Sequence, residues 1–264
     1  MAMRTLPALL VLLLLLCSRA GLAADPPVPH PTEKANDTKH VLVLGNSYSG
    51  GSAKAITELF KREAPEFRFT FVTPGGFTLE RHLKTPATRK RIASRDWDFV
   101  VLQDQSQTPG LPGKHGEGFH RAAAELSAMV RRQGRAKILL FMTWGRRDGD
   151  RRNPKIYPDF TTMHGKLSTQ YRIAAGKNKL GLAPVGDAFA LIHQRDQALF
   201  RSLYKNDGSH PAPTAGYLAA CVFYGALTGK PPAKIRWTAK LDPPRATTLR
   251  QAAADALRGP LARP

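Results

Sequence analysis

The chain has 264 residues and a formal net charge of +20, from 40 Lys and Arg against 20 Asp and Glu. This length suits one domain with a single hydrophobic core. The basic residues are spread along the chain without the aromatic-and-basic pattern of an RNA-recognition motif, so the sequence favours no specific nucleic-acid partner. The charge instead predicts a solvated basic surface, which can be attracted to an anionic envelope surface or another polyanion.

The first 24 residues have the pattern of a secretory signal peptide. A short basic start precedes an apolar run over 6–17, and small residues lead up to Ala24. The run is shorter than the ~20 residues that cross a bilayer, so we expect cleavage near Ala24 and a secreted or periplasmic protein, with an uncleaved anchor as the alternative. Cleavage would remove Cys17 and leave Cys221 without an internal disulfide partner.

A Pro-rich leader over 25–38 precedes a domain over 39–264, in which strand-like and helix-like segments alternate. In chain order we expect a strand at 40–45, a helix at 53–64, a strand at 67–72, helical segments on both sides of Pro86, a strand at 97–103, a helix at 118–134, a strand at 136–144, a helix at 160–176, a strand at 182–186, and helices at 187–202, 212–229 and 247–259. This alternation predicts a three-layer α/β fold with a parallel sheet, which binds ligands at the carboxyl ends of its strands.

The stretch VLVLGNSYSGGS (41–52) places small polar residues at the end of the first strand. It comes close to the phosphate-binding loop G-x-x-x-x-G-K-[ST], but Gly51 stands where that loop needs a lysine to meet the phosphates. Gly45, Ser47 and Ser49 also approach the G-x-S-x-G turn that carries the nucleophile of α/β-hydrolases. A serine here can act as a nucleophile if another segment supplies a histidine base.

The best candidate base lies in NDGSHPAPTAGY (206–217), around the start of the predicted helix at 212–229. Asp207 and His210 are three residues apart in a turn, so the carboxylate can reach Nδ1 of the imidazole and hold Nε2 towards a serine. The alternative is a loop histidine with a local capping contact. The other histidines are scattered without the spacing of metal ligands, so we expect neither a metal ion nor another cofactor.

Four blocks of the sequence together resemble the SGNH (GDSL-type) hydrolases. GNSYS resembles the first block, with Ser47 at the nucleophile position, and PGGFTLE resembles the second, with Gly76 at the position that supplies an oxyanion-hole N–H. VVLQDQSQTP falls where the third block follows its strand, with Gln105 at the position of the oxyanion-hole asparagine. DGSH resembles the fourth block, which makes Asp207 and His210 the acid and base of a triad.

The resemblance covers about residues 40–228 and implies a flavodoxin-like three-layer α/β/α sandwich with a mainly parallel five-stranded sheet. It also implies that the Ser47 N–H, the Gly76 N–H and the Gln105 amide form the oxyanion hole, with Gly75 as a second candidate glycine. The four blocks are similar to those of a secreted bacterial subgroup whose substrate is largely unassigned.

Gln103 stands at the glycine position of the third block, and the sequence departs from the SGNH pattern at two further positions that concern the site. Asn46 replaces the aspartate of the first block, which is not the nucleophile, so we expect a small effect. Gln105 replaces the asparagine of the third block, and its carboxamide reaches one methylene further. Gln103 and Gln107 are therefore alternatives for the oxyanion hole.

Three further residues each have a structural and a chemical interpretation. We expect Ser49 to be a structural hydroxyl at a helix start, and Asp187 to be a helix N-cap rather than the acid of the triad. Trp144 ends the predicted fourth strand, where it either contacts the substrate in the cleft or packs in the core.

The sequence therefore predicts a secreted serine esterase that acts on a small-molecule or polysaccharide ester, with O-acetyl groups of carbohydrates as the favoured target. The alternative is a non-catalytic carbohydrate- or polyanion-binding domain on the same scaffold, which the basic surface and the departures at Asn46 and Gln105 favour. The sequence indicates no particular oligomeric state.

Overall fold

A computed structural model of the chain describes Met1 and residues 38–259. The expected signal peptide over 1–24 and nearly all of the leader over 25–38 lie outside these described residues, so both stay predictions. The chain divides into a unit over Met1–Asn36 and a unit over Asp37–Pro264, and all helices and strands described below belong to the second. Among the residues described, no helix is both long and apolar enough to cross a membrane.

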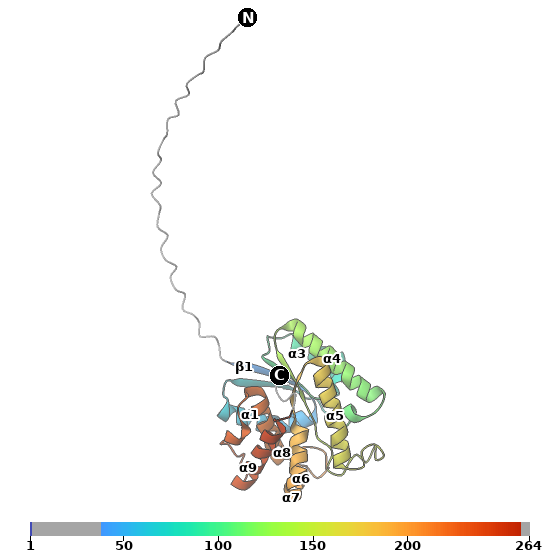
Figure 1. Ribbon diagram of the computed structural model, residues 1–264, viewed down its shortest axis with the longest axis vertical. Helices are drawn as coiled ribbons and strands as arrows, with labels where there is room; N and C mark the ends of the chain where they lie inside the picture. Colours follow the sequence, from blue (N-terminus) through green and yellow to red (C-terminus); the bar gives the residue numbers. More distant parts are fainter. Residues whose placement is uncertain (2–37, 260–264) are drawn as a thin grey trace, which may run out of the picture. The chain divides into compact units, whose positions relative to one another are not determined.

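Five parallel strands form one sheet in the order β2-β1-β3-β4-β5 (Figure 1). The strands are β1 (Lys39–Leu44), β2 (Phe67–Val72), β3 (Phe99–Leu102), β4 (Lys137–Phe141) and β5 (Gly181–Ala183). In the central register, Leu42 of β1 lies opposite Thr70 of β2 and Val100 of β3. This is the flavodoxin-like strand order. β2 lies on one side of β1, and β3, β4 and β5 follow in sequence on its other side. The predicted fold class is confirmed.

The helices follow the strands in the predicted alternation. They are α1 (Ser47–Glu63), α2 (Leu79–Lys84), α3 (Pro86–Ile92), α4 (Lys114–Gln133), α5 (Phe160–Asn178), α6 (Val185–Arg195), α7 (Gln197–Ser202), α8 (Pro213–Thr228) and α9 (Pro243–Ala256), with 3₁₀ turns at Thr108–Gly110 and Pro232–Lys234.

Two helix boundaries differ from the prediction for identifiable reasons. α1 begins at Ser47, six residues before the predicted start, because the side chain of Asn46 caps it. The helix predicted over 187–202 is two helices, since the carboxylate of Asp196 accepts the Leu199 N–H over 2.9 Å and starts α7 anew. In both places a capping side chain decides the boundary, and apolar spacing does not reveal it.

Alternate side chains of β1 enter two separate cores, one on each face of the sheet. Val41 and Val43 pack with α1, α6, α8 and α9, whereas Leu42 and Leu44 pack with α3, α4 and α5 (Figure 1). All four side chains are fully buried, as expected for a central strand of a parallel sheet. The loops at the carboxyl ends of the strands are therefore held by a core on each face.

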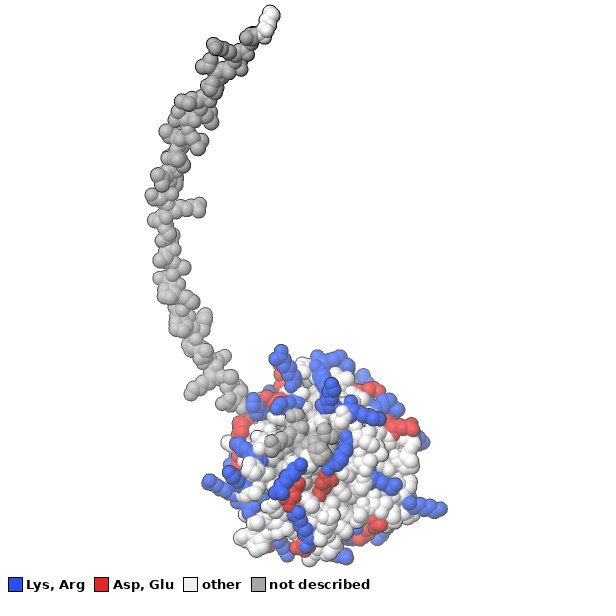
Figure 2. Space-filling model, in the orientation of Figure 1, with Lys and Arg blue, Asp and Glu red and all other residues white. Residues whose placement is uncertain are grey.

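Basic side chains are distributed over the face of the domain that Figure 2 shows. Figure 2 shows Lys and Arg across the visible face with Asp and Glu between them, without one concentrated basic patch. Attraction to an anionic envelope surface stays a prediction.

Candidate active site

Ser47 stands at the turn between β1 and α1. Asn46 caps the helix by accepting the Tyr48 N–H over 3.1 Å, and Ser47 is the first helical residue. A Cβ at Gly45 would collide with the buried side chain of Gln103, so only glycine fits this tight turn. The turn therefore holds the Ser47 hydroxyl at the positive end of the α1 dipole, where negative charge is stabilised.

The structure brings Ser47, His210 and Asp207 together although 163 residues separate the first two. Ser47 Oγ lies 3.0 Å from His210 Nε2, and His210 Nδ1 lies 2.6 Å from Asp207 Oδ2. The N–H groups of Ser209 and His210 each donate to Asp207 Oδ1 over 2.9 Å. Partial burial alone would raise the pKa of Asp207, but the hydrogen bonds from His210 and Ser209 outweigh it and lower that pKa to about 2. The acid is therefore ionised and oriented towards the imidazole.

The turn that carries Asp207 and His210 is fixed by backbone contacts. The Lys205 N–H donates to the His210 carbonyl over 2.9 Å, and the Arg147 N–H donates to the Gly208 carbonyl over 2.8 Å. Gly208 has a φ of +65°, in the left-handed region where a side chain would be strained. These contacts fix the backbone of the turn from which the His210 side chain projects.

A small cavity of about 210 Å³ opens beside the Ser47 hydroxyl. Ser47, Gly76 and Gln105, the three predicted oxyanion-hole residues, line it together with His210. Gly76 has a φ of +68°, and its N–H has no hydrogen-bond partner among the described residues. Donor groups from three separate segments thus reach one small space next to the hydroxyl.

The loop after β3 orients the Gln105 carboxamide. Gln105 Oε1 accepts the N–H groups of Gln107 and Thr108 over 2.9 and 3.3 Å, and the Thr108 hydroxyl over 3.1 Å. Because backbone N–H donors require the carbonyl oxygen on their side, Nε2 takes the other side. Nε2 makes one 3.3 Å contact with Ser106 Oγ, which leaves its second N–H for the cavity.

The two alternative glutamines are engaged elsewhere. Gln103 is fully buried, and its Oε1 accepts the Asn46 N–H over 3.0 Å and the Ser49 hydroxyl over 2.5 Å. This contact gives Ser49 the structural role predicted for it. Gln107 Oε1 accepts the guanidinium of Arg146 over 2.5 Å. Neither glutamine lines the cavity beside the nucleophile, so the geometry agrees with the first choice of donor.

A second histidine, His82, lies behind the turn that carries Ser47. His82 is fully buried, with Nε2 2.7 Å from the Gly45 carbonyl, so it supports the nucleophile turn from behind. Burial lowers the pKa of His82, which keeps it neutral there. Within residues 38–259, no group of three or more His, Cys, Asp or Glu side chains is arranged to hold a metal ion.

No family model matches the sequence, and a search of curated proteins finds no match. Solved structures do match. A DUF4886 family protein from Bacteroides uniformis has a TM-score of 0.73 and 20% identity, over 85% of this chain and 96% of its own. A putative SGNH hydrolase from Slackia heliotrinireducens has a TM-score of 0.58 and 28% identity, over 70% of this chain and 97% of its own. By its fold, this chain belongs to the SGNH hydrolase superfamily.

The SGNH fold is also shared with proteins described as esterases. An acetyl-xylooligosaccharide esterase from Geobacillus Stearmophilus matches with a TM-score of 0.52 and 17% identity, over 70% of this chain and 92% of its own. At this identity the match concerns the fold, so the chemistry of the present chain must be argued from its own site.

Asn46, a departure from the first SGNH block, makes a contact that an ionised aspartate cannot make. Its Nδ2 donates to the Phe77 carbonyl over 2.8 Å while its Oδ1 caps α1. Phe77 follows Gly76 in the chain, so the Asn46 side chain ties the Gly76 loop to the nucleophile turn. A carboxylate has only acceptors and would face the carbonyl without a proton to share.

Trp144 packs in the core of this SGNH domain and does not line the cavity. Its side chain is fully buried and is stacked between the rings of Tyr48 and Phe189, at centroid distances of 4.6 and 4.3 Å. Its Nε1 donates to the Ser209 carbonyl over 3.1 Å. The edge of the Tyr48 ring in turn meets the ring of His210 at 5.5 Å. Trp144 therefore supports the segment that carries His210, and a substrate contact does not fit its position.

Asp187 lies neither at a helix N-cap nor beside the base. α6 begins at Val185, so Asp187 belongs to its first turn, and the N-cap prediction is wrong. Its carboxylate accepts the Ser168 hydroxyl over 3.1 Å and pairs with Arg172 on the neighbouring helix α5. It therefore joins α5 to α6, and Asp207 has the geometry of the acid.

Sequence reasoning did not identify the role of Asp104. Its fully buried carboxylate accepts the Gln105 N–H over 2.5 Å and the Leu79 N–H over 3.2 Å. It thereby joins the loop that carries Gln105 to the start of α2, which follows Gly76. Burial raises the pKa of Asp104 to about 7, although both hydrogen bonds act in the opposite direction.

Arg146 is a second residue that sequence reasoning missed. Its guanidinium lines the cavity, donates to Ser106 Oγ over 3.2 Å and pairs with the buried carboxylate of Asp150 at 2.6 Å. It sits in a charged loop, where nothing in the spacing separates it from its arginine neighbours. Together with Ser106 it makes this wall of the cavity polar.

Proposed function

We propose that this protein is a serine esterase with Ser47 as nucleophile, His210 as general base and Asp207 as the orienting acid. The single observation that supports this most is the hydrogen-bonded chain from Ser47 Oγ through the imidazole to Asp207. No other described part of the chain offers a nucleophile in contact with a base that is itself oriented by a carboxylate.

In the first half of the reaction, Ser47 Oγ attacks the ester carbonyl and its proton passes to His210 Nε2. The carbonyl oxygen becomes an oxyanion, which the N–H groups of Ser47 and Gly76 and the Gln105 Nε2 stabilise. Collapse of this intermediate breaks the ester C–O bond, and His210 returns the proton to the leaving alkoxide. Water then attacks the acyl-enzyme by the same route and releases the acid.

The size and polarity of the cavity favour a small acyl group on a polar alcohol. A volume of about 210 Å³ accommodates an acetyl group, and the lining includes hydroxyl, carboxamide and guanidinium groups. Within the proposal, the substrate is therefore an O-acetylated carbohydrate or a similarly polar ester. The structurally similar esterase of acetylated xylo-oligosaccharides agrees with this substrate class. Action outside the cell or in the periplasm, after removal of residues 1–24, completes the proposal.

The test uses the purified chain, a short-chain aryl acetate and a fluorophosphonate probe that labels activated serines. We expect turnover and labelling at Ser47, and we expect Ser47→Ala to lower kcat/KM on the order of 10⁴-fold or more. Asp207→Asn should lower kcat on the order of 10³-fold or more, because the imidazole loses the group that fixes its tautomer.

Ser94→Ala is the matched control for the serine substitution. Ser94 is exposed on the loop between α3 and β3, far from the carboxyl ends of the strands, and its hydroxyl only caps the Arg91 carbonyl. Turnover of the acetate by Ser47→Ala at the wild-type rate would refute the nucleophile. Absence of both turnover and label in the wild type would instead favour a carbohydrate- or polyanion-binding domain.

A further inference from the structure

A second cavity, of about 550 Å³, lies beside α1 and next to the turn of the proposed base. Residues of α1 line it on one side, and Trp237, Ala239, Lys240 and Leu241 line it on the other. Lys205 and Pro211 come from the turn itself, and Pro211 directly follows His210. Its volume lies in the range of sites that bind small molecules.

The second cavity and the cavity beside Ser47 share no lining residue, but residues of α1 line both. Gly51, Lys54, Glu58 and Arg62 line it, and their spacing of three or four residues continues from Ser47, so all share one side of the helix. At a rise of 1.5 Å per residue, Lys54 lies about 10 Å and Arg62 about 22 Å along the axis from Ser47. The second cavity therefore lies on the same side of α1 as Ser47.

The charge that surrounds the second cavity is predominantly positive. Lys54, Lys205, Lys240 and Arg62 line it, with Glu58 as the single acid, which already pairs with Arg62. Among the described residues, none of the three lysines has an ion-pair partner. The cavity therefore offers three free ammonium groups to an anionic ligand.

Trp237 gives the same cavity a firmly held aromatic wall. The N–H groups of Arg236 and Trp237 both donate to Glu63 Oε1, over 2.8 and 2.7 Å, and the Trp237 carbonyl accepts the Tyr217 hydroxyl over 2.8 Å. The indole is only partly buried, unlike Trp97 and Trp144. The Arg62 guanidinium lies over this ring, 5.4 Å from its centroid. The rest of the apolar ring surface, among cations, suits a pyranose ring, whose C–H face packs on an aromatic ring while its acidic substituent meets an ammonium group.

The backbone of the aromatic wall is strained where it meets the cavity. Ala239 and Lys240 both line it and have φ values of +55° and +66°, in a region that costs a residue with a side chain roughly 1–2 kcal/mol. Only one other described non-glycine residue, Lys179, has a positive φ. Strain of this kind persists where surrounding contacts enforce it, and it concentrates at ligand sites.

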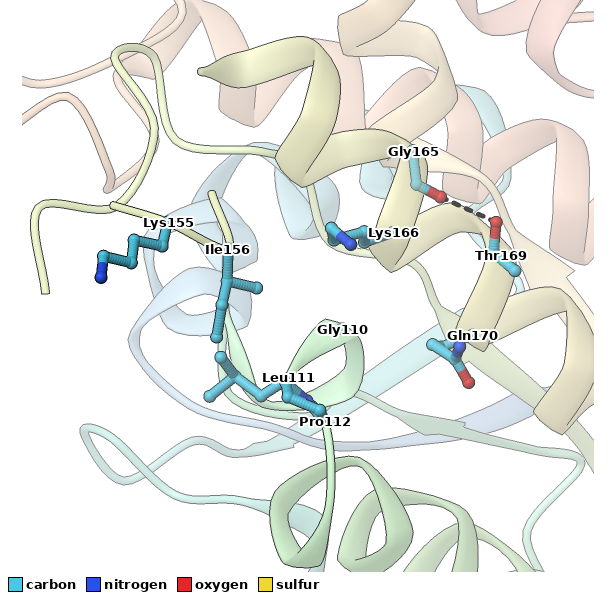
Figure 3. A pocket seen from close by; sticks show the side chains of 9 residues that line it. All are labelled: Gly110, Leu111, Pro112, Lys155, Ile156, Gly165, Lys166, Thr169 and Gln170. Atoms are coloured by element: carbon cyan, nitrogen blue, oxygen red, sulfur yellow. Dashed lines mark hydrogen bonds between the residues drawn. The ribbon is translucent and has the colours of Figure 1, made fainter. Parts of the chain in front are cut away.

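A third cavity, of about 470 Å³, lacks this combination (Figure 3). Glycines, aliphatic and polar side chains and two lysines line it, and Figure 3 shows Ile156 beside Leu111 at one end, with Lys155 pointing away from them. It therefore provides charge without an aromatic wall. The cavity at Trp237 is the better candidate for a sugar.

We propose that the cavity between α1 and Trp237 is a subsite for an acidic glycan, with the sugar ring on Trp237 and its carboxylate or sulfate groups on Lys54, Lys205 and Lys240. This inference rests on the proposed esterase function only in assigning the glycan as substrate. A chain seated there extends along α1 and delivers an ester on a neighbouring sugar unit to Ser47.

The test measures binding of tetragalacturonate to the full chain carrying Ser47→Ala, so that it does not depend on turnover. Because Trp97 and Trp144 are buried, a change in tryptophan fluorescence reports on Trp237. We expect saturable quenching by tetragalacturonate and about tenfold weaker binding of neutral xylotetraose. Trp237→Phe should abolish the quenching, with affinity followed by calorimetry.

The lysines are tested as a group against a matched group elsewhere. The triple variant Lys54→Ala, Lys205→Ala, Lys240→Ala should weaken tetragalacturonate binding about tenfold or more, whereas Lys155→Ala, Lys166→Ala, Lys177→Ala should change it less than about twofold. Both triples remove the same net charge. Thermal melting of each variant excludes unfolding as the cause.

Three results would overturn the subsite. Equal weakening of binding by both triple variants would show that only the net charge of the protein matters. Equal binding of xylotetraose would show that the cavity does not recognise the acidic groups of the glycan. Equal quenching by polyglutamate, which carries carboxylates but no sugar ring, would show that the cavity does not recognise a sugar. A wild-type protein that binds tetragalacturonate but neither hydrolyses an aryl acetate nor reacts with the fluorophosphonate would refute the esterase and leave the subsite intact.

Discussion

Replacing Asp104 with asparagine should remove a pH dependence from the stability of the fold. The Asp104 carboxyl is fully buried behind the cavity, and burial raises its pKa from 3.8 to about 7. Between these two values the folded protein holds a proton that the unfolded chain has released. The free energy of unfolding therefore falls as the pH rises from about 4 to about 7, and above that range this carboxyl adds no further pH dependence.

The size of the effect follows from the two pKa values. The contribution of this carboxyl to the free energy of unfolding falls by about 2.5 kcal/mol between pH 5 and pH 8. Asparagine releases no proton over this range, and any effect of its amide on the Gln105 and Leu79 contacts is the same at both pH values. As the pH rises from 5 to 8, the free energy of unfolding of the variant should therefore gain about 2.5 kcal/mol relative to that of the wild type.

The assay is urea unfolding followed by circular dichroism at pH 5, 6, 7 and 8, for the wild type, Asp104→Asn and Asp96→Asn. Asp96 is an exposed residue on the loop before β3, so its substitution should leave the pH dependence unchanged. If the wild-type and Asp104→Asn free energies ran parallel from pH 5 to pH 8, the buried carboxyl would not carry the proton, and the reasoning would be refuted.

Two further substitutions test contacts around the nucleophile. Asn46→Asp should lower the free energy of unfolding by about 1–3 kcal/mol and also lower kcat on an aryl acetate, because the Phe77 carbonyl loses its donor and the Gly76 loop its anchor; unchanged stability and kcat would show that this contact is unimportant. Trp144→Ala should cost about 3–5 kcal/mol in urea unfolding, since it empties the space between two stacked rings; a loss below about 1 kcal/mol would contradict this packing.

The sequence was sufficient to predict the sheet and the segments that meet at its edge. β1 could be recognised because Val41 to Leu44 are continuously apolar, as a strand buried on both faces must be. The sequence also predicted one shared site for Ser47, Gly76, Gln105 and His210, because each lies in a block of the SGNH pattern. In the structure, these four residues line one cavity.

Features that depend on side-chain contacts between distant segments could not be predicted. Nothing in the sequence distinguishes the stacked Trp144 from one that lines a cleft, because its partners Tyr48 and Phe189 are far away in the chain. The sequence likewise could not decide which of three glutamines donates to the oxyanion hole, because this depends on the hydrogen bonds that Gln103 and Gln107 make elsewhere. The role of Asp104 could not be read from the spacing of apolar residues, because it arises from the burial of its carboxyl group.

The long chain separation between Ser47 and His210 makes the site a late product of synthesis. A ribosome completes the nucleophile turn early, whereas the base emerges only after β5 and α7, with α8 still to follow. A nascent or truncated chain that stops before residue 210 therefore has a serine without a base, and it cannot hydrolyse esters by this mechanism. Under the proposed mechanism, recovery of esterase activity after dilution from denaturant would consequently report assembly of the entire sheet.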